Sequence, residues 1–386
     1  MGRYLLRRLL GTVLVLWVIV TGSFFLMRFA PGGPFDRDRR LPPNVEANKW
    51  LIFGMGEEVT APVAGTITSV GTFVTKHTEY AAGTVLATIQ PTAGGAPVEV
   101  RLEDDSPIVA VGVEAGATVA VGARIVVVPK PLLAQYWDAI GHYLTLDFGK
   151  TITSEGTRDV SEELLRALPI SFQLGVMALF FALAIGITLG LLAGLKQNTW
   201  VDYSVMTGAM VGASIPTMVS GPLIVAVFAL GLGWFPVAGW ESSQAEWSTW
   251  QYRVLPVITL GLAYVPVIAR LTRGGMLEVV RSDWIRAARA KGLSERTIVL
   301  RHALRPALLP TISWLGPGTA GIVTGSIVIE RVFGIPGLSE HFVTPALNRD
   351  YPMVIGVVVV YSVILVVLNL LVDLAYTFLD PRVSLE

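Results

Sequence analysis

The sequence contains no cysteine and little charge, and these two absences exclude several classes of protein. Without cysteine there is no disulfide framework, no thiolate metal site and no catalytic thiol. Charged residues make up 15% of the chain, the formal net charge is zero and 53% of the residues are hydrophobic. This balance is too apolar for a soluble globular domain, and it offers no basic surplus for nucleic acid. The composition therefore indicates a membrane protein without a nucleic-acid partner.

Recognisable nucleotide and metal sites are missing as well. No stretch matches the G-x-x-x-x-G-K-[ST] phosphate-binding loop, so the chain has no such loop of its own for ATP. The histidines, His77, His142, His302 and His341, are widely separated and make no H-x-x-x-H ligand spacing. We expect no catalytic residue, cofactor or metal in this chain. If ATP drives the protein, another subunit must bind the ATP and its Mg.

Long apolar runs occupy most of the chain outside residues 51–130. The first, Leu9–Met27, follows Arg3, Arg7 and Arg8 and is long enough to cross a bilayer core. No small-x-small cleavage site follows it, so we expect a retained span rather than a secretory signal. Basic residues gather in the short loops on the side of the N-terminus, which predicts that both termini are cytoplasmic. The pattern predicts six transmembrane helices, at 9–27, 171–195, 203–232 with a kink at Pro216, 254–269, 308–329 and 353–375.

Two shorter helices are predicted between the first two spans. Leu132–Leu146 is amphipathic and should end at the Asp147-Phe148-Gly149 turn, whereas Val160–Leu168 should stop before Pro169. Along the second span, glycines recur and permit close contact with a neighbouring helix. These glycines are Gly175, Gly186, Gly190 and Gly194.

Residues 51–130 have a different character, with short Val-, Ile- and Thr-rich runs separated by glycine turns. No run there is long enough to cross a membrane, so we expect a small all-β module outside the membrane. The segment repeats itself at an offset of 39 residues, as Gly83 with Gly122 and Leu86 with Ile125 illustrate. Two similar β halves predict a lipoyl/biotinyl-like flattened barrel.

A lipoyl or biotinyl carrier needs a lysine at an exposed hairpin tip, and the sequence does not provide one. The expected tip, Gln90–Pro97, has no lysine, and Lys76 is the only lysine between Leu51 and Pro129. We therefore expect a carrier-like fold without the carrier function. An acidic edge at Leu102–Ser106 and Glu114 is either a docking surface or a solvated face.

The segment Ser282–Pro310 is the one long polar stretch between strongly apolar ones, and it is rich in arginine. Ser282 and Ser294 are suitable N-caps, Gly292 is a suitable helix stop, and Pro306 is the next break. This pattern predicts two short amphipathic helices joined by a glycine turn at a membrane surface. A solvated basic loop that merely follows the positive-inside rule is the alternative.

The spacing Ala287-Ala288-x-x-x-Gly292 resembles the E-A-A-x-x-x-G coupling loop with which membrane subunits of ABC importers engage their ATPases. Arg286 stands where that pattern has Glu. The resemblance implies a coupling loop at 271–307. Its candidate residues are Arg286, Ala287, Ala288, Lys291, Gly292, Leu293, Arg301, His302 and Pro306.

Further motifs resemble the oligopeptide-permease B-type membrane subunit of bacterial ABC importers, which is related to dipeptide and nickel permeases. They are RFAPGGPF at 28–35, LPP at 41–43, DFG at 147–149, LKQNTWVDY at 195–203, GSIVIERVFGIP at 325–336, ALNRDY at 346–351 and Asp380-Pro381. The resemblance implies the type I importer permease fold. It divides the chain into 1–50 (first span and external lead-in), 51–130 (β module) and 131–386 (the other five spans). The β module is expected to be an insertion without a counterpart in the family.

The same resemblance implies a location in the bacterial inner membrane and a set of partners. These are a second homologous permease, two cytoplasmic ATP-binding subunits, an external peptide-binding protein and membrane lipid. The main prediction is therefore a permease subunit for oligopeptides or dipeptides, with hydrolysis performed by the partner ATPases.

Three alternatives remain open at this point. The solute imported could be a nickel chelate or another small molecule. The chain could be the membrane subunit of a biotin-dependent decarboxylase pump, although the missing hairpin lysine argues against it. It could also be an efflux permease with a fused adaptor, which an importer-type coupling loop disfavours.

Overall fold

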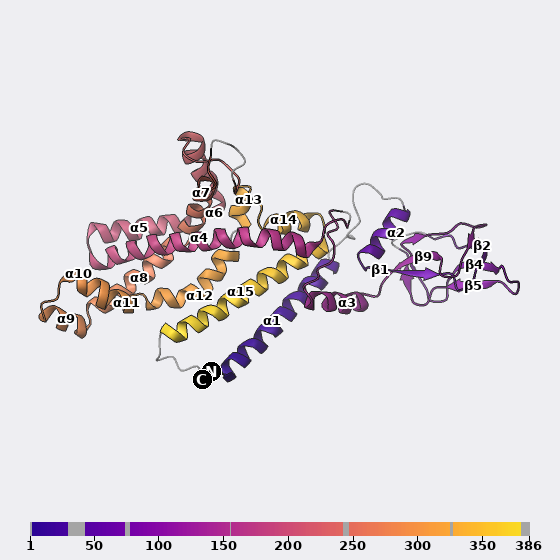
Figure 1. The fold of residues 1–386 in the computed structure, drawn as a ribbon, viewed down its shortest axis with the longest axis horizontal. Coiled ribbons are helices and arrows are strands. Elements are labelled where there is room, and N and C mark those ends of the chain that lie inside the picture. The colour runs from indigo at the N-terminus through magenta and orange to yellow at the C-terminus, as the bar shows by residue number, and fades with distance from the viewer. Residues whose placement is uncertain are drawn as a thin grey trace. The chain divides into compact units, whose positions relative to one another are not determined.

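A computed structural model describes residues 2–29, 43–73, 78–154, 156–241, 247–324 and 327–379. The chain is mainly helical, with all of the described strands between α2 (Pro43–Ile52) and α3 (Leu132–Leu144) (Figure 1). It divides into two compact units. A helical unit comprises 1–22, 163–344 and 357–386, and a β-containing unit comprises 23–162 and 345–356.

Three described helices are long and apolar enough to cross a membrane, namely α1 (Gly2–Phe29), α4 (Val160–Leu195) and α15 (Tyr351–Leu379). Two bent pairs also meet the criterion: α5 (Trp200–Ser214) with α6 (Thr217–Ile224) and the π-helical η1 (Val225–Gly231), and α7 (Thr249–Leu262) with α8 (Val265–Val280). The described residues thus account for up to five spans. The predicted span at 308–329 corresponds to α12 (Leu309–Thr324) and α13 (Ile327–Val332), and Gly325 and Ser326 lie outside the description.

Proline was expected to shape two helix boundaries, and the structure differs from the prediction at one of them. The separate helix predicted before Pro169 is wrong, because α4 continues through that residue with Leu164, Ala167 and Leu174 buried on either side. Burial of the surrounding turns outweighs the one backbone hydrogen bond that a proline removes. At Pro216 the predicted interruption is present and is sharper than a kink: Ile215 is extended, and α5 meets the α6–η1 helix at 103°. The steric clash of a proline with the preceding residue explains this break.

The polar segment that follows α8 is helical throughout most of its length. Since α8 continues to Val280, the first residues of the predicted loop 271–307 belong to that helix. The chain then forms α9 (Asp283–Ala290), α10 (Glu295–Thr297), the π-helical η2 (Ile298–Ala303) and α11 (Leu304–Ala307) before α12. The later α14 (Glu340–Leu347) precedes α15.

The β-containing unit holds nine strands in the described residues. They are β1 (Gly56–Thr60), β2 (Gly65–Val70), β3 (Glu79–Tyr80), β4 (Val85–Pro91), β5 (Val98–Arg101), β6 (Ser106–Pro107), β7 (Ala110–Val111), β8 (Thr118–Val119) and β9 (Arg124–Pro129). All strand pairs are antiparallel, in three sheets ordered β1-β9-β7, β5-β4-β2-β8 and β3-β6. None of these described sheets closes on itself, so the strand pairing differs from the predicted barrel. Many of the strands have two residues, and strands this short cannot maintain a continuous ladder around a barrel.

The predicted internal repeat is visible in equivalent backbone hydrogen bonds. The Gly83 N–H donates to the Leu102 carbonyl at 2.8 Å, and the Gly122 N–H donates to the Ala61 carbonyl at the same distance. Leu86 and Ile125, which the repeat pairs, are both fully buried in one core. The two halves therefore share one turn geometry around a common apolar interior.

Two further predictions concern the edges of this unit. The predicted external lead-in ends in the helix α2, which packs Ala47 against Val109 and Val127. Pro43 begins that helix, where the missing N–H has no intrahelical partner to lose. The predicted hairpin tip does connect β4 and β5, while Lys76 and His77 lie outside the described residues.

Candidate functional site

The turn after α9 ends this helix by the mechanism that the sequence predicts. Gly292 has a φ of +77°, in the left-handed region that favours glycine. Its N–H donates to the Arg289 carbonyl at 2.9 Å, and the Leu293 N–H donates to the Ala288 carbonyl at 3.4 Å. These two bonds form a Schellman motif, which satisfies carbonyls at the helix end. An added Cβ at Gly292 would meet no atom within 4 Å, so the backbone angle alone requires glycine here.

After the turn, a side-chain cap and an ion pair define the second helix. Ser294 Oγ accepts the Thr297 N–H at 3.4 Å, which makes Ser294 the N-cap of α10. Across the turn, Arg289 Nε donates to Glu295 Oε1 at 2.7 Å and Arg289 Nη2 to Glu295 Oε2 at 3.3 Å. The Arg289 guanidinium lowers the pKa of the Glu295 carboxyl below its ordinary value. This pair joins the two sides of the turn, and residues 283–303 are named here the α9–α10 hairpin.

An apolar inner face attaches the hairpin to the helical unit. Ile285 of α9 and Ile298 of η2 are buried together with Met276 and Val279 of α8. Ala303 and Ala307 complete this cluster. Burial of the isoleucine, methionine and valine side chains in this cluster contributes about 1.5–3 kcal/mol each. The hairpin is therefore packed on α8 rather than free in solvent.

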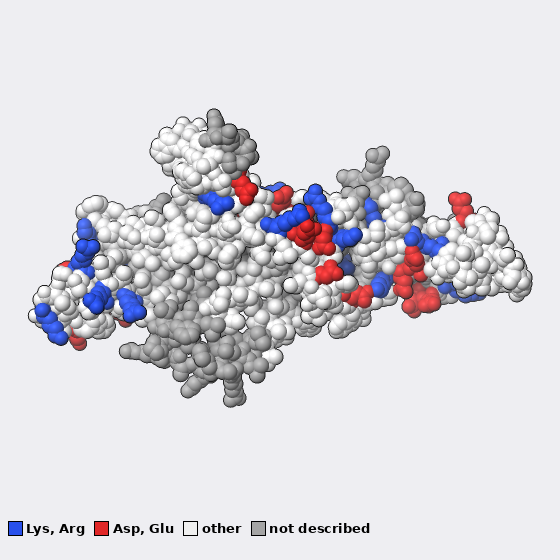
Figure 2. All heavy atoms as spheres, in the orientation of Figure 1, with Lys and Arg blue, Asp and Glu red and all other residues white. Residues whose placement is uncertain are grey.

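The outer face of the hairpin carries most of the predicted site residues. Arg286, Ala287, Lys291, Gly292, Leu293, Arg301 and His302 are exposed, whereas Ala288 and Pro306 are half-buried. Arg286 forms an ion pair with Asp283 one turn earlier on α9. Figure 2 shows Lys and Arg side chains gathered over the end of the helical unit that α9 and α10 form. The prediction of two short amphipathic helices around a glycine turn is confirmed in its geometry.

Sequence reasoning missed two apolar side chains on this face. Trp284 is 56% exposed and Leu300 is 52% exposed, although both are large and hydrophobic. An aromatic residue inside a polar, arginine-rich segment was the available signal. Together with Leu293, they make a face that combines apolar and cationic side chains, which is suited to contact with another protein or a membrane surface.

A second polar cluster involves the GSIVIERVFGIP motif. Glu330 of α13 is fully buried, and its Oε2 accepts the Ser339 N–H at 2.9 Å. Ser171 Oγ of α4 accepts the Leu338 N–H at 2.9 Å. Glu330 of the motif thus fixes the loop after α13, and Ser171 attaches the same loop to α4, so this buried carboxylate is used in a structural hydrogen bond.

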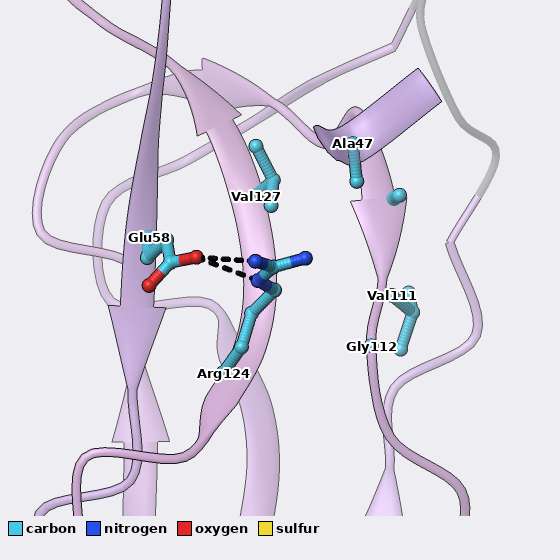
Figure 3. A pocket seen from close by; sticks show the side chains of 7 residues that line it. Ala47, Glu58, Val111, Gly112, Arg124 and Val127 are labelled. Carbon is cyan, nitrogen blue, oxygen red and sulfur yellow. Dashed lines mark hydrogen bonds and ion pairs between the residues drawn. The ribbon is translucent and has the colours of Figure 1, made fainter. Parts of the chain in front are cut away.

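The β-containing unit has a cavity of about 460 Å³ beside α2 (Figure 3). Ala47, Val111 and Val127 line it, together with the ion pair between Arg124 and Glu58 at 2.7 Å. Arg124 also donates to Asn48 Oδ1 at 2.7 Å. Because these contacts already occupy the charged groups, the cavity offers few free polar contacts to a ligand. Among the described residues there is no group of His, Cys, Asp and Glu suited to holding a metal ion.

Comparison with known proteins relates this architecture to transport. The family model described as "Binding-protein-dependent transport system inner membrane component" matches residues 186–385, which include the whole hairpin. The oligopeptide transport system permease protein OppB of Haemophilus influenzae is 35% identical over 383 residues, and the match covers 99% of this chain and 99% of that protein. The dipeptide transport system permease protein DppB of Bacillus subtilis is 44% identical over 256 residues, covering 66% of this chain and 80% of that protein. A solved structure, the inward-facing MetNI methionine ABC transporter, has a TM-score of 0.48 at 18% identity and covers 56% of this chain and 96% of the matched chain.

The OppB match corrects one expectation about residues 51–130. These residues were expected to lack a counterpart in the family, but an alignment over 99% of both chains leaves no room for an unmatched module of that length. The DppB match is shorter and covers 66% of this chain. By the near-complete match to OppB and by the family model, the chain belongs to the oligopeptide and dipeptide permease family of binding-protein-dependent transport systems.

Proposed function

We propose that this chain is a transmembrane permease subunit of an ATP-driven ABC importer for oligopeptides or dipeptides. The observation that carries the proposal is the similarity to OppB over 99% of both chains. The chain itself is not an enzyme: its relatives are permease subunits, and ATP and Mg bind to partner subunits. A second permease completes the translocation path, and an external peptide-binding protein delivers the substrate.

The proposed membrane topology has six spans of the type I importer fold, with both termini in the cytoplasm. Up to five spans among the described helices, and the apolar α12–α13 segment, support it. Because the chain has no native cysteine, single cysteines can report sidedness. Ala93→Cys in the β4–β5 hairpin should react with an impermeant maleimide from outside, and Ala290→Cys in α9 only from inside. Reversed labelling would overturn the topology.

The proposed role of the α9–α10 hairpin is to contact a cytoplasmic ATPase. Its support is the outer face of exposed cationic and apolar side chains on a rigidly packed base. ATP binding can shift the permease between inward-facing and outward-facing states only if the contact differs in free energy between them. Arg286, Ala287, Ala288, Lys291, Leu293, Arg301, His302 and Pro306 remain the proposed contact or support residues around Gly292.

Lipid and the second permease are the proposed neighbours of the exposed apolar faces. On α1, Leu10 and Leu14 are 62% and 59% exposed, and on α5, Met210 is 71% exposed. Side chains of this kind need an apolar environment or a partner helix. A translocation path between such helices would carry few fixed charges, and this suits peptides of varied sequence.

The β-containing unit is proposed to be an unmodified external element that assists the peptide-binding protein. Glu103, Asp104, Asp105 and Glu114 are exposed and form the proposed acidic edge. The stranded part of this unit, residues 56–129, can be bridged, because the Lys130 N–H donates to the Met55 carbonyl at 2.8 Å and brings the two ends together. Replacing Gly56–Pro129 by a short Gly-Ser bridge should preserve assembly and basal ATPase activity while weakening binding-protein-dependent uptake. Unchanged uptake would show that the module takes no part in substrate delivery.

The function is tested by reconstituting the chain with the second permease, the ATPases and the peptide-binding protein encoded with it. Uptake of radiolabelled di- to pentapeptides into ATP-loaded proteoliposomes should depend on all partners. Uptake of a nickel chelate but not of peptides would favour the alternative solute. A biotinyl or lipoyl adduct in the intact mass would favour the decarboxylase pump.

A further inference from the structure

The helix that supports the hairpin, α8, lies against α4 along a series of glycines four residues apart. An added Cβ at Gly186 would lie 2.7 Å from Ile268 Cβ, and one at Gly194 would lie 2.7 Å from Met276 Cβ. At Gly190 it would come closer than 3.0 Å to the Ala269 carbonyl. The two backbones therefore pack in close contact, which small residues spaced four apart permit in membrane helices.

The turn between α4 and α5 is bound to α8 as well. Asp202 on the first turn of α5 is 1% exposed, and its carboxylate accepts Arg273 Nε at 2.6 Å and Nη2 at 2.7 Å. The same carboxylate accepts the Asn198 N–H of the turn at 3.0 Å. Nearby, Arg281 Nη2 donates to Gln197 Oε1 at 3.0 Å. The Asp202 carboxylate is buried, whereas the Arg273 side chain is 28% exposed. A bidentate, charge-assisted pair with an additional backbone donor is strong in geometry, and loss of Arg273 would leave the buried carboxylate without its charged partner.

The position of Arg273 connects this pair to the hairpin. Arg273 lies on α8, whose last residue is separated from α9 only by Arg281 and Ser282, and Ser282 Oγ donates to the Val279 carbonyl at 2.6 Å. Asp202 lies on α5, the first half of the helix pair bent by 103°. A displacement of α9 that moves α8 therefore acts on α5 at this pair, beside the packing of the two helices against each other.

We propose that the Asp202–Arg273 pair transmits the movement of the α9–α10 hairpin to α5, so that both residues are positioning residues for coupling. The inference rests on the proposed function, since it concerns a subunit that works with ATPases. It assigns no contact with substrate or ATP to either residue. The α4 glycines and this pair together make α4, α8 and the start of α5 one moving body.

The first test measures ATP hydrolysis and peptide uptake in parallel in the complete reconstituted transporter. Asp202→Asn should retain ATPase activity but reduce the peptide transported per ATP by about fivefold or more. Arg281→Gln, which removes the more exposed bond of the same turn, is the matched control and should leave the ratio near that of the wild type. If Asp202→Asn changes only the melting temperature and leaves the ratio intact, the pair is merely structural and the proposal is overturned.

A double variant separates stability from transmission. In Asp202→Asn/Arg273→Gln neither side chain is charged, so the partly buried guanidinium is no longer left without its carboxylate and the melting temperature should rise relative to the single variant. The coupling ratio should stay low, because the connection is still weakened. Recovery of both quantities would contradict the proposal.

A distance measurement applies even if the variants fail to assemble. Spin labels on Tyr203→Cys of α5 and Glu278→Cys of α8, both exposed positions, report the separation of these helices. In the complete transporter this distance should be the same without nucleotide and in the vanadate-trapped state. A changed distance would overturn the proposal. If the unsubstituted transporter imports no peptide, the proposed function fails. If it imports peptide normally but the distance between the labels changes, only the proposal about the pair fails.

Discussion

Two regions of the helical unit use glycine for opposite physical reasons. On α8, Gly275 has ordinary helical geometry, but an added Cβ would come closer than 3.0 Å to the Ala307 carbonyl of α11. In the α9–α10 hairpin, Gly292 has open space around it but a φ of +77°. The first glycine is required by a neighbouring backbone and the second by its own backbone. The effect of a substitution should therefore depend on side-chain size at Gly275 and on the backbone conformation that the new residue tolerates at Gly292.

Gly275 belongs to the packing that supports the hairpin, whereas Gly292 belongs to the turn within it. The contact at Gly275 sets how closely α8 and α11 pack, and Thr272 Oγ1 and Thr311 Oγ1 form a buried hydrogen bond at 3.1 Å one turn away. The turn at Gly292 only directs the chain from α9 to α10. We expect damage at Gly275 to affect folding, and damage at Gly292 to affect coupling while the fold persists.

The largest effect is expected at Gly275. Gly275→Ala must separate α8 from α11, and overpacking of this kind costs about 1–3 kcal/mol or more. Its neighbour Gly274 has no atom within 4 Å of an added Cβ, so Gly274→Ala is a matched control that should be neutral or slightly stabilising. The measurement is the melting temperature of the purified complex in detergent. Equal melting temperatures for the two variants would refute the packing argument.

A smaller effect on stability, but a clear one on transport, is expected at Gly292. Gly292→Val places a β-branched residue in the left-handed region at a cost of about 1–2 kcal/mol. Gly292→Asn is the control, because asparagine tolerates this conformation. The valine variant should assemble and hydrolyse ATP yet lose most peptide uptake, whereas the asparagine variant should resemble the wild type. Equal uptake by both would mean that the turn geometry is not needed for coupling.

The smallest effect is expected at the ion pair across the turn. Glu295→Gln weakens the link to Arg289 and should lower the melting temperature slightly, since exposed pairs contribute little. Because the folded-state pKa of Glu295 lies below its ordinary 4.5, its contribution is present above that pH and is lost as the pH falls through the folded value. The difference between wild type and variant should be constant from pH 7 to 5 and shrink below about 4.5. A difference that grows on acidification would contradict this assignment.

The predictions from sequence succeeded where a local signal was sufficient. Gly292 and Ser294 are a helix stop and an N-cap by their own chemistry, and α3 ends before the Asp147-Phe148-Gly149 turn as its polarity pattern suggests. They failed at Pro169, where burial of the surrounding turns outweighed the usual effect of a proline. The role of the hairpin residues stays a prediction.

By itself, the sequence determined the apolar helices, the β character of residues 51–130 with its repeat, and the glycine turn between α9 and α10, because each depends on residues close together in the chain. It also carried the motifs of the permease family. The contacts of Gly190 and Gly275, and the pairing of Asp202 with Arg273 across 71 residues, depend on how helices cross. Crossing is set by the summed packing of many side chains, so these features became visible only in the folded chain.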